Sequence, residues 1–216
     1  MDDLIRRAYI FSHGRLVSFP APTRDMLTIA ADGGARHLLR VGCTPDIVIG
    51  DFDSLGPDEL DTLAASGCRV IRYPAAKDQT DTQLAVEFAI EEGATDLTLY
   101  GGLGSRLDHS MANVMLLALI HERGCTGRVT DGEQVVQLLV DEMTVSGAAG
   151  DVVSILPLTP VLEGLTIKGL KYPLQDATIR MGDSRTISNE FGTPGTGTIT
   201  LRSGVAMVVQ VPMGGA

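Results

Sequence analysis

The hydrophobic pattern changes in character near the middle of the chain. Up to about Gly124, short apolar runs alternate with stretches whose apolar residues recur every three or four positions. This alternation is typical of βαβ units, in which helices connect the strands of a parallel sheet. The strands are predicted over Ala8–Ser12, Leu27–Ala31, Ile47–Ile49, Arg69–Tyr73 and Leu97–Tyr100.

The stretches between these strands predict helices. The clearest, Asp81–Glu92, has one apolar face and is preceded by Thr80, which with Gln83 fits a capping box. Asp81 therefore falls in the first helical turn, near the positive end of the helix dipole. The other helices are predicted over Ala35–Val41, Pro57–Ala65 and Asp108–Arg123.

After Gly124 the helical periodicity disappears, and short Val-, Thr- and Ile-rich runs are separated by Gly and Pro. Their spacing suggests an antiparallel sandwich or barrel. We therefore expect a domain boundary near Gly124–Arg128. The strands are predicted over Val135–Val140, Met143–Val145, Val152–Leu156, Leu165–Ile167, Thr186–Ser188, Gly197–Leu201 and Val205–Val211.

Composition narrows the classes of function. The chain has 216 residues, 44% of them hydrophobic and 20% charged, with a formal net charge of -10. This charge argues against general affinity for nucleic acid or an anionic membrane, which are bound chiefly through clustered Lys and Arg. A local phosphate site stays compatible with it.

The cysteines and the lengths of the apolar runs bear on the cellular location of the protein. Cys43, Cys68 and Cys125 are too few and too scattered for a disulfide framework or a zinc site. No stretch is long and apolar enough to span a bilayer, and the amino terminus lacks the layout of a signal peptide. We expect a cytoplasmic protein.

Acidic segments follow three of the predicted strands. Asp51 and Asp53 come after Ile47–Ile49, the segment Lys77–Asp81 comes after Arg69–Tyr73, and Gly101–His109 comes after Leu97–Tyr100. In a parallel sheet these segments converge at the carboxyl edge, where open α/β sheets bind ligands. If the chain stays extended past the strand, Asp51 and Asp53 point to the same side. Paired carboxylates beside Gly-rich backbone suit Mg²⁺ and phosphate.

Three further features of this edge each have a plainer interpretation as well. Asp32–Gly34 follows a strand and allows close approach of a ligand, but Asp32 could simply cap a turn. Within Lys77–Asp81, the Lys offers a phosphate partner, Asp81 is the better metal candidate, and Asp78 could only complement the helix dipole. Ser54 can cap the following helix.

The Gly-rich segment Gly101–Arg106 resembles a phosphate-binding loop, because its glycines expose amide groups just before a helix. It matches neither the P-loop pattern nor the dinucleotide fingerprint. Arg106 could grip phosphate oxygens or pair with a neighbouring Asp. His109 reads more simply as a hydrogen-bonded residue of the first helical turn, and Asn113 either faces the pocket or caps a carbonyl.

Taken together, these segments closely resemble the thiamine pyrophosphokinase family. The resemblance rests on Asp32–Ala35, Gly50–Ser54, Lys77–Asp81 and Gly101–His109 with Asn113, and it continues through Gly169–Leu174 and Ser188–Phe191. It implies a Rossmann-like α/β nucleotide domain over residues 1–125 and a β-sandwich thiamine domain over residues 126–216. It further implies transfer of the pyrophosphoryl group of Mg-ATP to the thiamine hydroxyl, and a homodimer with the thiamine pocket at the subunit interface.

The resemblance also implies roles for individual residues. Asp51, Asp53, Asp81 and Asp108 are expected to hold Mg²⁺ and the phosphate end, with Asp51 or Asp53 as the proton acceptor and Arg106 stabilising charge. Thiamine is expected to contact Ser188 and Asn189, with Tyr172 or Phe191 as the aromatic neighbour. The expected nucleotide-binding residues are Asp32, Gly33, Gly34, Lys77, Asp78, Gly102, Gly104 and Asn113.

Two alternatives stay open at this point. A pyrophosphokinase for another hydroxymethyl heterocycle, such as a pterin, would keep the acidic segments and differ only on the sandwich side. A non-catalytic Mg-nucleotide sensor would also keep a phosphate site, although it has less use for so many carboxylates together with Arg106.

Overall fold

The structure is a computed structural model that describes residues 7–104 and 106–214. Ser105, within the predicted phosphate loop, lies outside these residues. Contacts within the chain divide it into two units, Met1–Gly132 and Glu133–Ala216. The predicted boundary between residues 125 and 126 stays a prediction. Of the helices in the described part, none has both the length and the apolar character that a membrane span requires.

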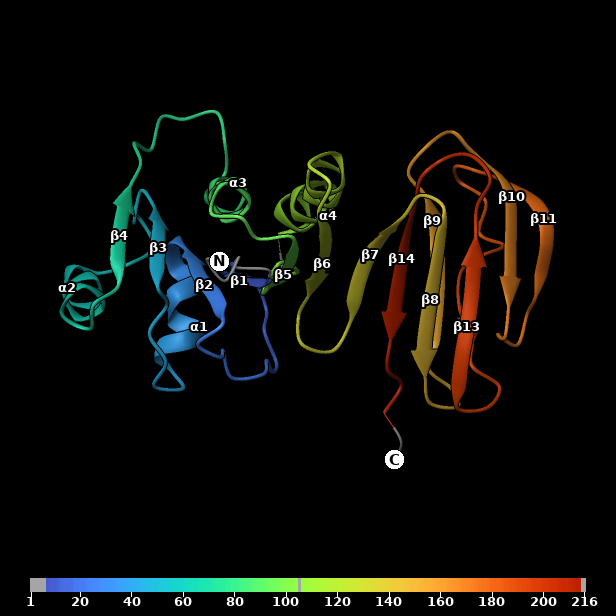
Figure 1. The fold of residues 1–216 in the computed structure, drawn as a ribbon, viewed down its shortest axis with the longest axis horizontal. Helices are drawn as coiled ribbons and strands as arrows, with labels where there is room; N and C mark the ends of the chain where they lie inside the picture. The colour runs from blue at the N-terminus through green and yellow to red at the C-terminus, as the bar shows by residue number, and fades with distance from the viewer. Residues whose placement is uncertain (1–6, 105, 215–216) are drawn as a thin grey trace, which may run out of the picture. The chain divides into compact units, whose positions relative to one another are not determined.

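The first unit is built on a parallel sheet in the order β6-β5-β1-β2-β3-β4 (Figure 1). The inner strands Met26–Ala31 and Ile47–Gly50 are almost continuously apolar because both faces are covered, whereas the edge strand Arg69–Arg72 is mostly exposed. The strands are β1 (Arg7–Phe11), β2 (Met26–Ala31), β3 (Ile47–Gly50), β4 (Arg69–Arg72), β5 (Asp96–Tyr100) and β6 (Thr126–Thr130).

Helices join these strands in the alternation that the sequence predicts. A 3-10 turn, η1 (Asp32–Gly34), leads from β2 into α1, and Figure 1 shows α1 on the opposite side of the sheet from α3 and α4. Phe11, Leu38 and Tyr100 form a core cluster beneath α1. The helices are α1 (Ala35–Leu39), α2 (Pro57–Ala65), α3 (Asp81–Glu91) and α4 (Leu107–Glu122).

The order of the strands determines where a ligand can bind. The chain starts in the middle of the sheet at β1, moves outward through β2, β3 and β4, and then returns to the other side of β1 with β5. Ile10 of β1 lies between Ile29 of β2 and Leu99 of β5. The crevice at such a switch point, outside the carboxyl ends of the strands, is the usual binding place in this type of sheet.

The second unit is a β-sandwich. One sheet has the order β12-β9-β14-β7 and the other β11-β10-β13-β8, and both contribute to a shared core that includes Phe191. Its strands are β7 (Val135–Leu139), β8 (Glu142–Gly147), β9 (Val152–Pro157), β10 (Val161–Lys168), β11 (Leu174–Arg180), β12 (Asn189–Glu190), β13 (Gly195–Thr200) and β14 (Ala206–Val211).

One predicted strand of this unit was wrong. Thr186–Ser188 forms a turn, with Ser188 in the left-handed region at φ 57°. The buried Thr186 hydroxyl donates a hydrogen bond to the Ile155 carbonyl at 2.6 Å, so Thr186 is buried without being part of a ladder. The strands β6 and β11 were not predicted, because Gly127 and Asp176 interrupt their alternation.

Candidate functional site

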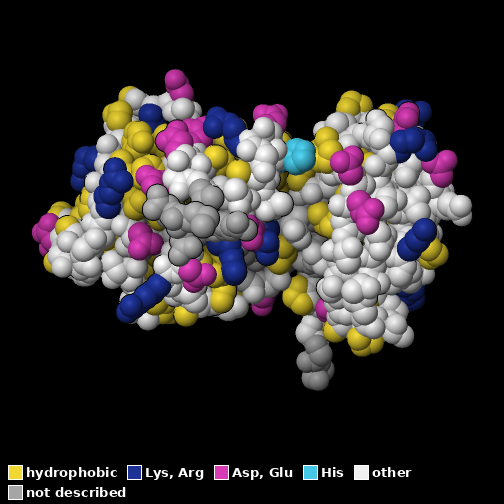
Figure 2. Space-filling view, viewed as in Figure 1, with side chains coloured by type: hydrophobic (Ala, Val, Ile, Leu, Met, Phe, Trp, Pro, Cys, Tyr) yellow, Lys and Arg dark blue, Asp and Glu magenta, His cyan; other side chains and the backbone are white. Residues whose placement is uncertain are grey.

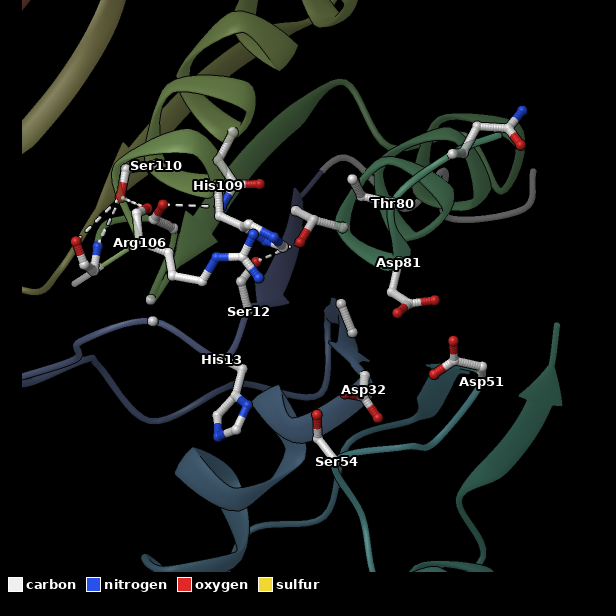
Figure 3. Close-up of a pocket in the computed structure, with 18 of the residues that line it drawn as sticks. Ser12, His13, Asp32, Asp51, Ser54, Thr80, Asp81, Arg106, His109 and Ser110 are labelled. Atoms are coloured by element: carbon white, nitrogen blue, oxygen red, sulfur yellow. Dashed lines mark hydrogen bonds between the residues drawn. The ribbon is translucent and has the colours of Figure 1, made fainter. Parts of the chain in front are cut away.

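A cavity of about 530 Å³ opens at the carboxyl edge of the parallel sheet, between the ends of β1, β2, β3 and β5 and the starts of α3 and α4. Figure 3 shows Arg106 and His109 on one side of it and Asp32, Asp51 and Asp81 on the other. On the molecular surface, acidic side chains gather near the upper edge of the first unit with basic ones beside them (Figure 2). The described lining residues belong to the first unit.

Three carboxylates in this cavity lie close enough to share a cation. Oxygen atoms of Asp32, Asp51 and Asp53 lie within 4.8 Å of one another. Asp32 is 8% exposed, and its Oδ1 has no hydrogen-bond partner within the described residues. Carboxylates held this close repel one another unless a cation offsets their charge. The cluster therefore has the composition of a divalent-metal site.

The backbone that brings Asp51 and Asp53 together is not extended, contrary to the expectation. Phe52, between them, has φ 63°, and its side chain is buried in the core below the cavity. The Arg72 guanidinium covers the Phe52 ring at 4.8 Å and donates a hydrogen bond to the Asp51 carbonyl at 3.0 Å. Left-handed backbone at a bulky residue is strained, and here core packing holds it in place.

Lys77 is the basic group nearest to these carboxylates. Its Nζ lies 2.9 Å from Asp81 Oδ1 and 3.5 Å from Asp51 Oδ2, and its side chain is only 11% exposed. Burial acts to lower the pKa of Lys77, but Asp81 and Asp51 outweigh it, so the pKa lies above its usual value. Burial raises the pKa of Asp81, and Asp51 and Asp32 add to the rise, while Lys77 opposes it. The Lys77 ammonium group therefore offsets the negative charge of both Asp51 and Asp81.

The start of α3 follows the prediction only in part. The Thr80 hydroxyl accepts a hydrogen bond from the Gln83 amide at 3.2 Å, as expected of an N-cap. The Gln83 side chain instead donates to Glu87, so we find no reciprocal half of a capping box. Asp81 lies in the first turn of α3, where the helix dipole favours negative charge.

The Gly-rich loop before α4 is held from several sides. Buried Asn113 donates a hydrogen bond from Nδ2 to the Gly102 carbonyl at 2.9 Å, and the Ser110 hydroxyl accepts one from the Gly104 amide at 3.0 Å. The Gly101 amide donates to the Thr130 carbonyl of β6. The loop is therefore a preformed element, and its Gly101, Gly102 and Gly104 line the cavity.

Arg106 and Asp108 form a pair at the mouth of the cavity. Arg106 Nε lies 3.2 Å from Asp108 Oδ1, and Nη2 lies 2.5 Å from Oδ2. This bidentate contact lowers the pKa of Asp108 to about 2. Both side chains are well exposed, at 68% and 63%. Arg106 lines the cavity, whereas Asp108 lies outside both its lining and the cluster of three carboxylates.

The other residues with predicted roles divide between the cavity and its surroundings. Asp32, Lys77, Gly102, Gly104 and Asn113 line the cavity, whereas Gly33, Gly34 and Asp78 are outside its lining. Gly34 supports it indirectly, because a Cβ there would lie 1.9 Å from the Phe11 carbonyl oxygen.

Ser12, His13 and Gly14 line the cavity and were missed by the sequence reasoning. They directly follow a buried strand, as Asp32–Gly34 does, and this position after a strand is the sequence feature that could have identified them as site residues. The Ser12 hydroxyl lies 3.0 Å from the Thr82 hydroxyl in a buried contact. The His13 ring packs over Gly33, where a Cβ would lie 2.6 Å from Nδ1.

In the second unit, Ser188 lies in the turn before β12, and Asn189 is the first residue of β12. Asn189 is 5% exposed; its Oδ1 accepts from the Tyr172 and Glu190 amides, and its Nδ2 donates to the Tyr172 carbonyl at 2.8 Å. The Ser188 amide donates to the Ser154 hydroxyl. Of the two aromatic candidates, Phe191 is 2% exposed in the core and Tyr172 is 56% exposed.

Known proteins match this chain in both units. Residues 23–126 match the family "Thiamin pyrophosphokinase, catalytic domain", and residues 140–206 match "Thiamin pyrophosphokinase, vitamin B1 binding domain". The thiamine pyrophosphokinase of Bacillus subtilis (strain 168) is 30% identical over 186 residues, which cover 85% of this chain and 86% of that protein.

Solved structures agree with these matches. A crystal structure of the Bacillus subtilis enzyme has a TM-score of 0.85 at 28% identity and covers 96% of this chain and 99% of its own. A thiamin pyrophosphokinase family protein from Enterococcus faecalis gives 0.83 at 28% identity, covering 97% of this chain and 100% of its own. The enzyme from Candida albicans, at 16% identity, shares the fold with a TM-score of 0.78, covering 95% of this chain and 89% of its own.

Proposed function

Because this chain belongs to the thiamin pyrophosphokinase family, we propose that it transfers the pyrophosphoryl group of ATP to the hydroxyl of thiamine. The products are thiamine diphosphate and AMP. The observation that carries this proposal is the cluster of Asp32, Asp51 and Asp53 within the segment that matches the catalytic domain. The cluster lies in the same cavity as a Gly-rich loop and two basic side chains.

ATP is the co-substrate, and we propose that its phosphates lie along the loop Gly101–Gly104. Preformed amide groups before a helix suit phosphate oxygens. Arg106 reaches the same cavity and can exchange its contact with Asp108 for a phosphate. Lys77 adds a second positive charge that its carboxylate neighbours keep protonated.

The cluster of three carboxylates fits a magnesium ion. Among the residues that the structure describes, none donates a hydrogen bond to the buried Oδ1 of Asp32, and Asp51 and Asp53 approach it closely; a hard cation with oxygen ligands would satisfy both features. When bound, Mg²⁺ would neutralise charge on the phosphates of ATP. We propose Asp32, Asp51 and Asp53 as the residues that hold it; the metal roles expected of Asp81 and Asp108 stay predictions.

The remaining catalytic work is alignment and movement of one proton. The thiamine hydroxyl attacks the β-phosphorus of ATP, and AMP leaves. Asp51 or Asp53 accepts the hydroxyl proton in this proposal, since both carboxylates reach the cavity. Lys77 fixes the orientation of Asp51 and Asp81 through its two contacts.

We propose that the sandwich unit supplies thiamine recognition, as its match to the vitamin B1 binding domain supports. Tyr172 is the aromatic side chain in the matching segments that is exposed enough to contact a ring. The Asn189 side chain accepts a hydrogen bond from the Tyr172 amide and donates one to the Tyr172 carbonyl, so we propose that Asn189 contributes to binding through Tyr172. Ser188 stays a predicted thiamine contact.

We also propose that the protein is a homodimer. Helix α4 is apolar on both faces: Val114, Leu117 and Ile120 are buried, while Leu107, Met111 and Met115 form an exposed stripe. These three residues are spaced four apart and so lie on one face of the helix, and an exposed apolar stripe of this kind suits a protein partner. The first turn of α4 carries Asp108 and directly follows Arg106, so a partner bound to this face would lie beside the cavity. Sedimentation of the wild type and of Met115→Glu tests the proposed dimer, and the variant is expected to be monomeric.

A cytoplasmic location of the protein stays a prediction.

The assay that tests the proposed function mixes purified protein with Mg-ATP and thiamine and measures AMP and thiamine diphosphate. Equal amounts of the two products are expected, with no AMP when thiamine is left out. AMP formation that ignores thiamine but requires a pterin alcohol would replace this function with its neighbour. ATP binding without AMP formation would indicate a sensor.

A further inference from the structure

The turn after β1 is joined to the Gly-rich loop by backbone hydrogen bonds. The Gly14 amide donates to the Gly101 carbonyl at 2.9 Å, and the Arg15 amide donates to the Leu103 carbonyl at 2.8 Å. These bonds continue the pairing of β1 with β5 beyond the end of both strands. The position of the loop therefore depends on the position of this turn.

The two backbones approach so closely that only glycine fits between them. A Cβ on Gly14 would lie 2.3 Å from the Gly101 oxygen and 2.4 Å from the Leu103 oxygen. A Cβ on Gly104 would lie 3.2 Å from the Gly14 Cα. With no side chain between the turn and the loop, a displacement of one is passed directly to the other.

His37 holds the turn from the opposite side. Its Nε2 lies 3.0 Å from the Gly14 carbonyl oxygen, and since a carbonyl only accepts, Nε2 carries the hydrogen. The ring also lies against the loop itself, because a Cβ on Gly101 would be 3.3 Å from Nε2. His37 is half-buried and belongs to α1, so it links this helix to the turn.

The charge state of His37 suits this contact. Burial lowers the pKa of His37, and the neighbouring charges of Arg40 and His13 lower it further, against the opposing effect of backbone hydrogen bonds. The ring is therefore neutral at physiological pH, with its single hydrogen on the nitrogen that faces Gly14.

We propose that His37 is a positioning residue for nucleotide binding, which acts through Gly14 to fix the loop Gly101–Gly104. The proposal rests on the proposed function only in that this loop receives the phosphates of ATP. Its effect should fall on nucleotide affinity and leave the thiamine side unchanged, because the contacts of His37 are with the turn and the loop.

The first test measures binding of Mg-ADP by calorimetry without thiamine. His37→Leu, which keeps bulk but removes the donor, should weaken binding about tenfold, the size expected for a lost hydrogen bond to a buried carbonyl. His37→Gln, whose amide can reach the same carbonyl, should restore most of the affinity. Asp61→Asn, exposed on α2, is the control and should bind as wild type.

In turnover, His37→Leu should raise the KM for ATP with kcat and the KM for thiamine within about twofold of wild type. Unchanged nucleotide affinity in His37→Leu would overturn the proposal, and so would an equal loss in His37→Gln, which would point to ring shape instead of the donor. If the Leu variant does not fold, His37→Asn, too short to reach Gly14, takes its place with the same expectations.

A second readout does not depend on the reaction at all. Amide hydrogen exchange of the ligand-free protein should become faster in residues 12–16 and 101–104 of His37→Leu, and stay unchanged in β9 and β10. Unchanged exchange in both segments would overturn the positioning role even if the enzyme assay succeeds. Faster exchange together with no thiamine-dependent AMP would uphold the role of His37 and reject the proposed function.

Discussion

The carboxyl edge of the parallel sheet and the start of β12 in the sandwich, at Asn189, use their polar side chains in opposite ways. At the sheet edge, Asp32 has a buried oxygen that finds no hydrogen-bond partner in the described part of the chain, and the carboxylates of Asp51 and Asp81 lie close to the Lys77 ammonium group. At the start of β12, the buried side-chain amide of Asn189 makes three hydrogen bonds to backbone. The carboxylates at the edge need a ligand to balance their charge and hydrogen bonding, whereas the hydrogen bonds of the Asn189 side chain are made within the protein.

This difference separates two reasons for a polar residue to be buried. A buried polar group that satisfies its hydrogen bonds stabilises the fold, and its removal leaves its partners unpaired. A crowded acidic cluster weakens the fold by repulsion and is tolerated for what it binds. Substitutions at the two places should therefore differ in which quantity they change, activity or stability.

The largest effect is expected from removing a carboxylate of the cluster. Asp53→Asn should lower kcat by about 100- to 1000-fold, because the charge that offsets a bound cation is lost. Its free energy of unfolding should stay equal or rise, since repulsion is relieved. Asp61→Asn, on the exposed face of α2, is the matched control. Full turnover in Asp53→Asn would remove Asp53 from the proposed site.

The second largest effect is expected at Asn189, and it concerns the free energy of unfolding. Asn189→Leu should reduce the free energy of unfolding by about 3 kcal/mol, since both backbone groups of Tyr172 lose their partner. Denaturant titration measures this loss. An Asn189→Leu protein with unchanged stability and no affinity for thiamine would reverse the comparison, because Asn189 would then be a ligand contact.

A glycine substitution tests whether the edge also has structural requirements. Gly14→Ala should cost about 2 kcal/mol of stability and weaken nucleotide binding, because the new Cβ overlaps the Gly101 and Leu103 carbonyls. Gly192→Ala, in open space within the second unit, should change neither quantity. Equal thermal midpoints for the two variants would show that the turn moves freely.

The smallest effect concerns pH. Glu59 pairs with Arg36 at two distances of 2.8 Å and accepts from the Gly56 amide, which lowers its pKa from 4.5 to about 2. A lowered folded-state pKa gives stability that is present above pH 4.5 and lost as pH falls toward 2. The pair is partly exposed, so about 1 kcal/mol is expected. Glu59→Gln should lower stability at pH 7 and nearly match wild type only near pH 2, whereas the loss in Asn189→Leu should persist at both.

Local pattern was enough to predict most of the first unit. Helix Pro57–Ala65 follows from its proline start and from Gly67 beyond its end, and the parallel sheet follows from short apolar runs that alternate with helices. Strand β6 was missed because Gly127 lies inside it. A Cβ there would be 3.0 Å from Leu117 and Ile120, so the glycine allows α4 to pack closely.

The site could be predicted as a region but not as a geometry. Acidic segments after parallel strands indicate one shared edge, and that reasoning needs no tertiary contact. Asp32 joins Asp51 and Asp53 through left-handed backbone at Asp32 and Phe52, which the sequence pattern does not reveal. Likewise, the bonds of Asn189 to Tyr172 span 17 residues and depend on the folded sandwich.

The most direct test of the central claim is the binding of Mn²⁺, as a spectroscopic substitute for Mg²⁺, in the presence of ATP. Wild type and Asp61→Asn should bind the ion equally, and Asp32→Asn and Asp53→Asn should each bind it at least about tenfold more weakly. Wild-type affinity for Mn²⁺ in both cluster variants would contradict the assignment of the acidic edge as the metal-nucleotide site.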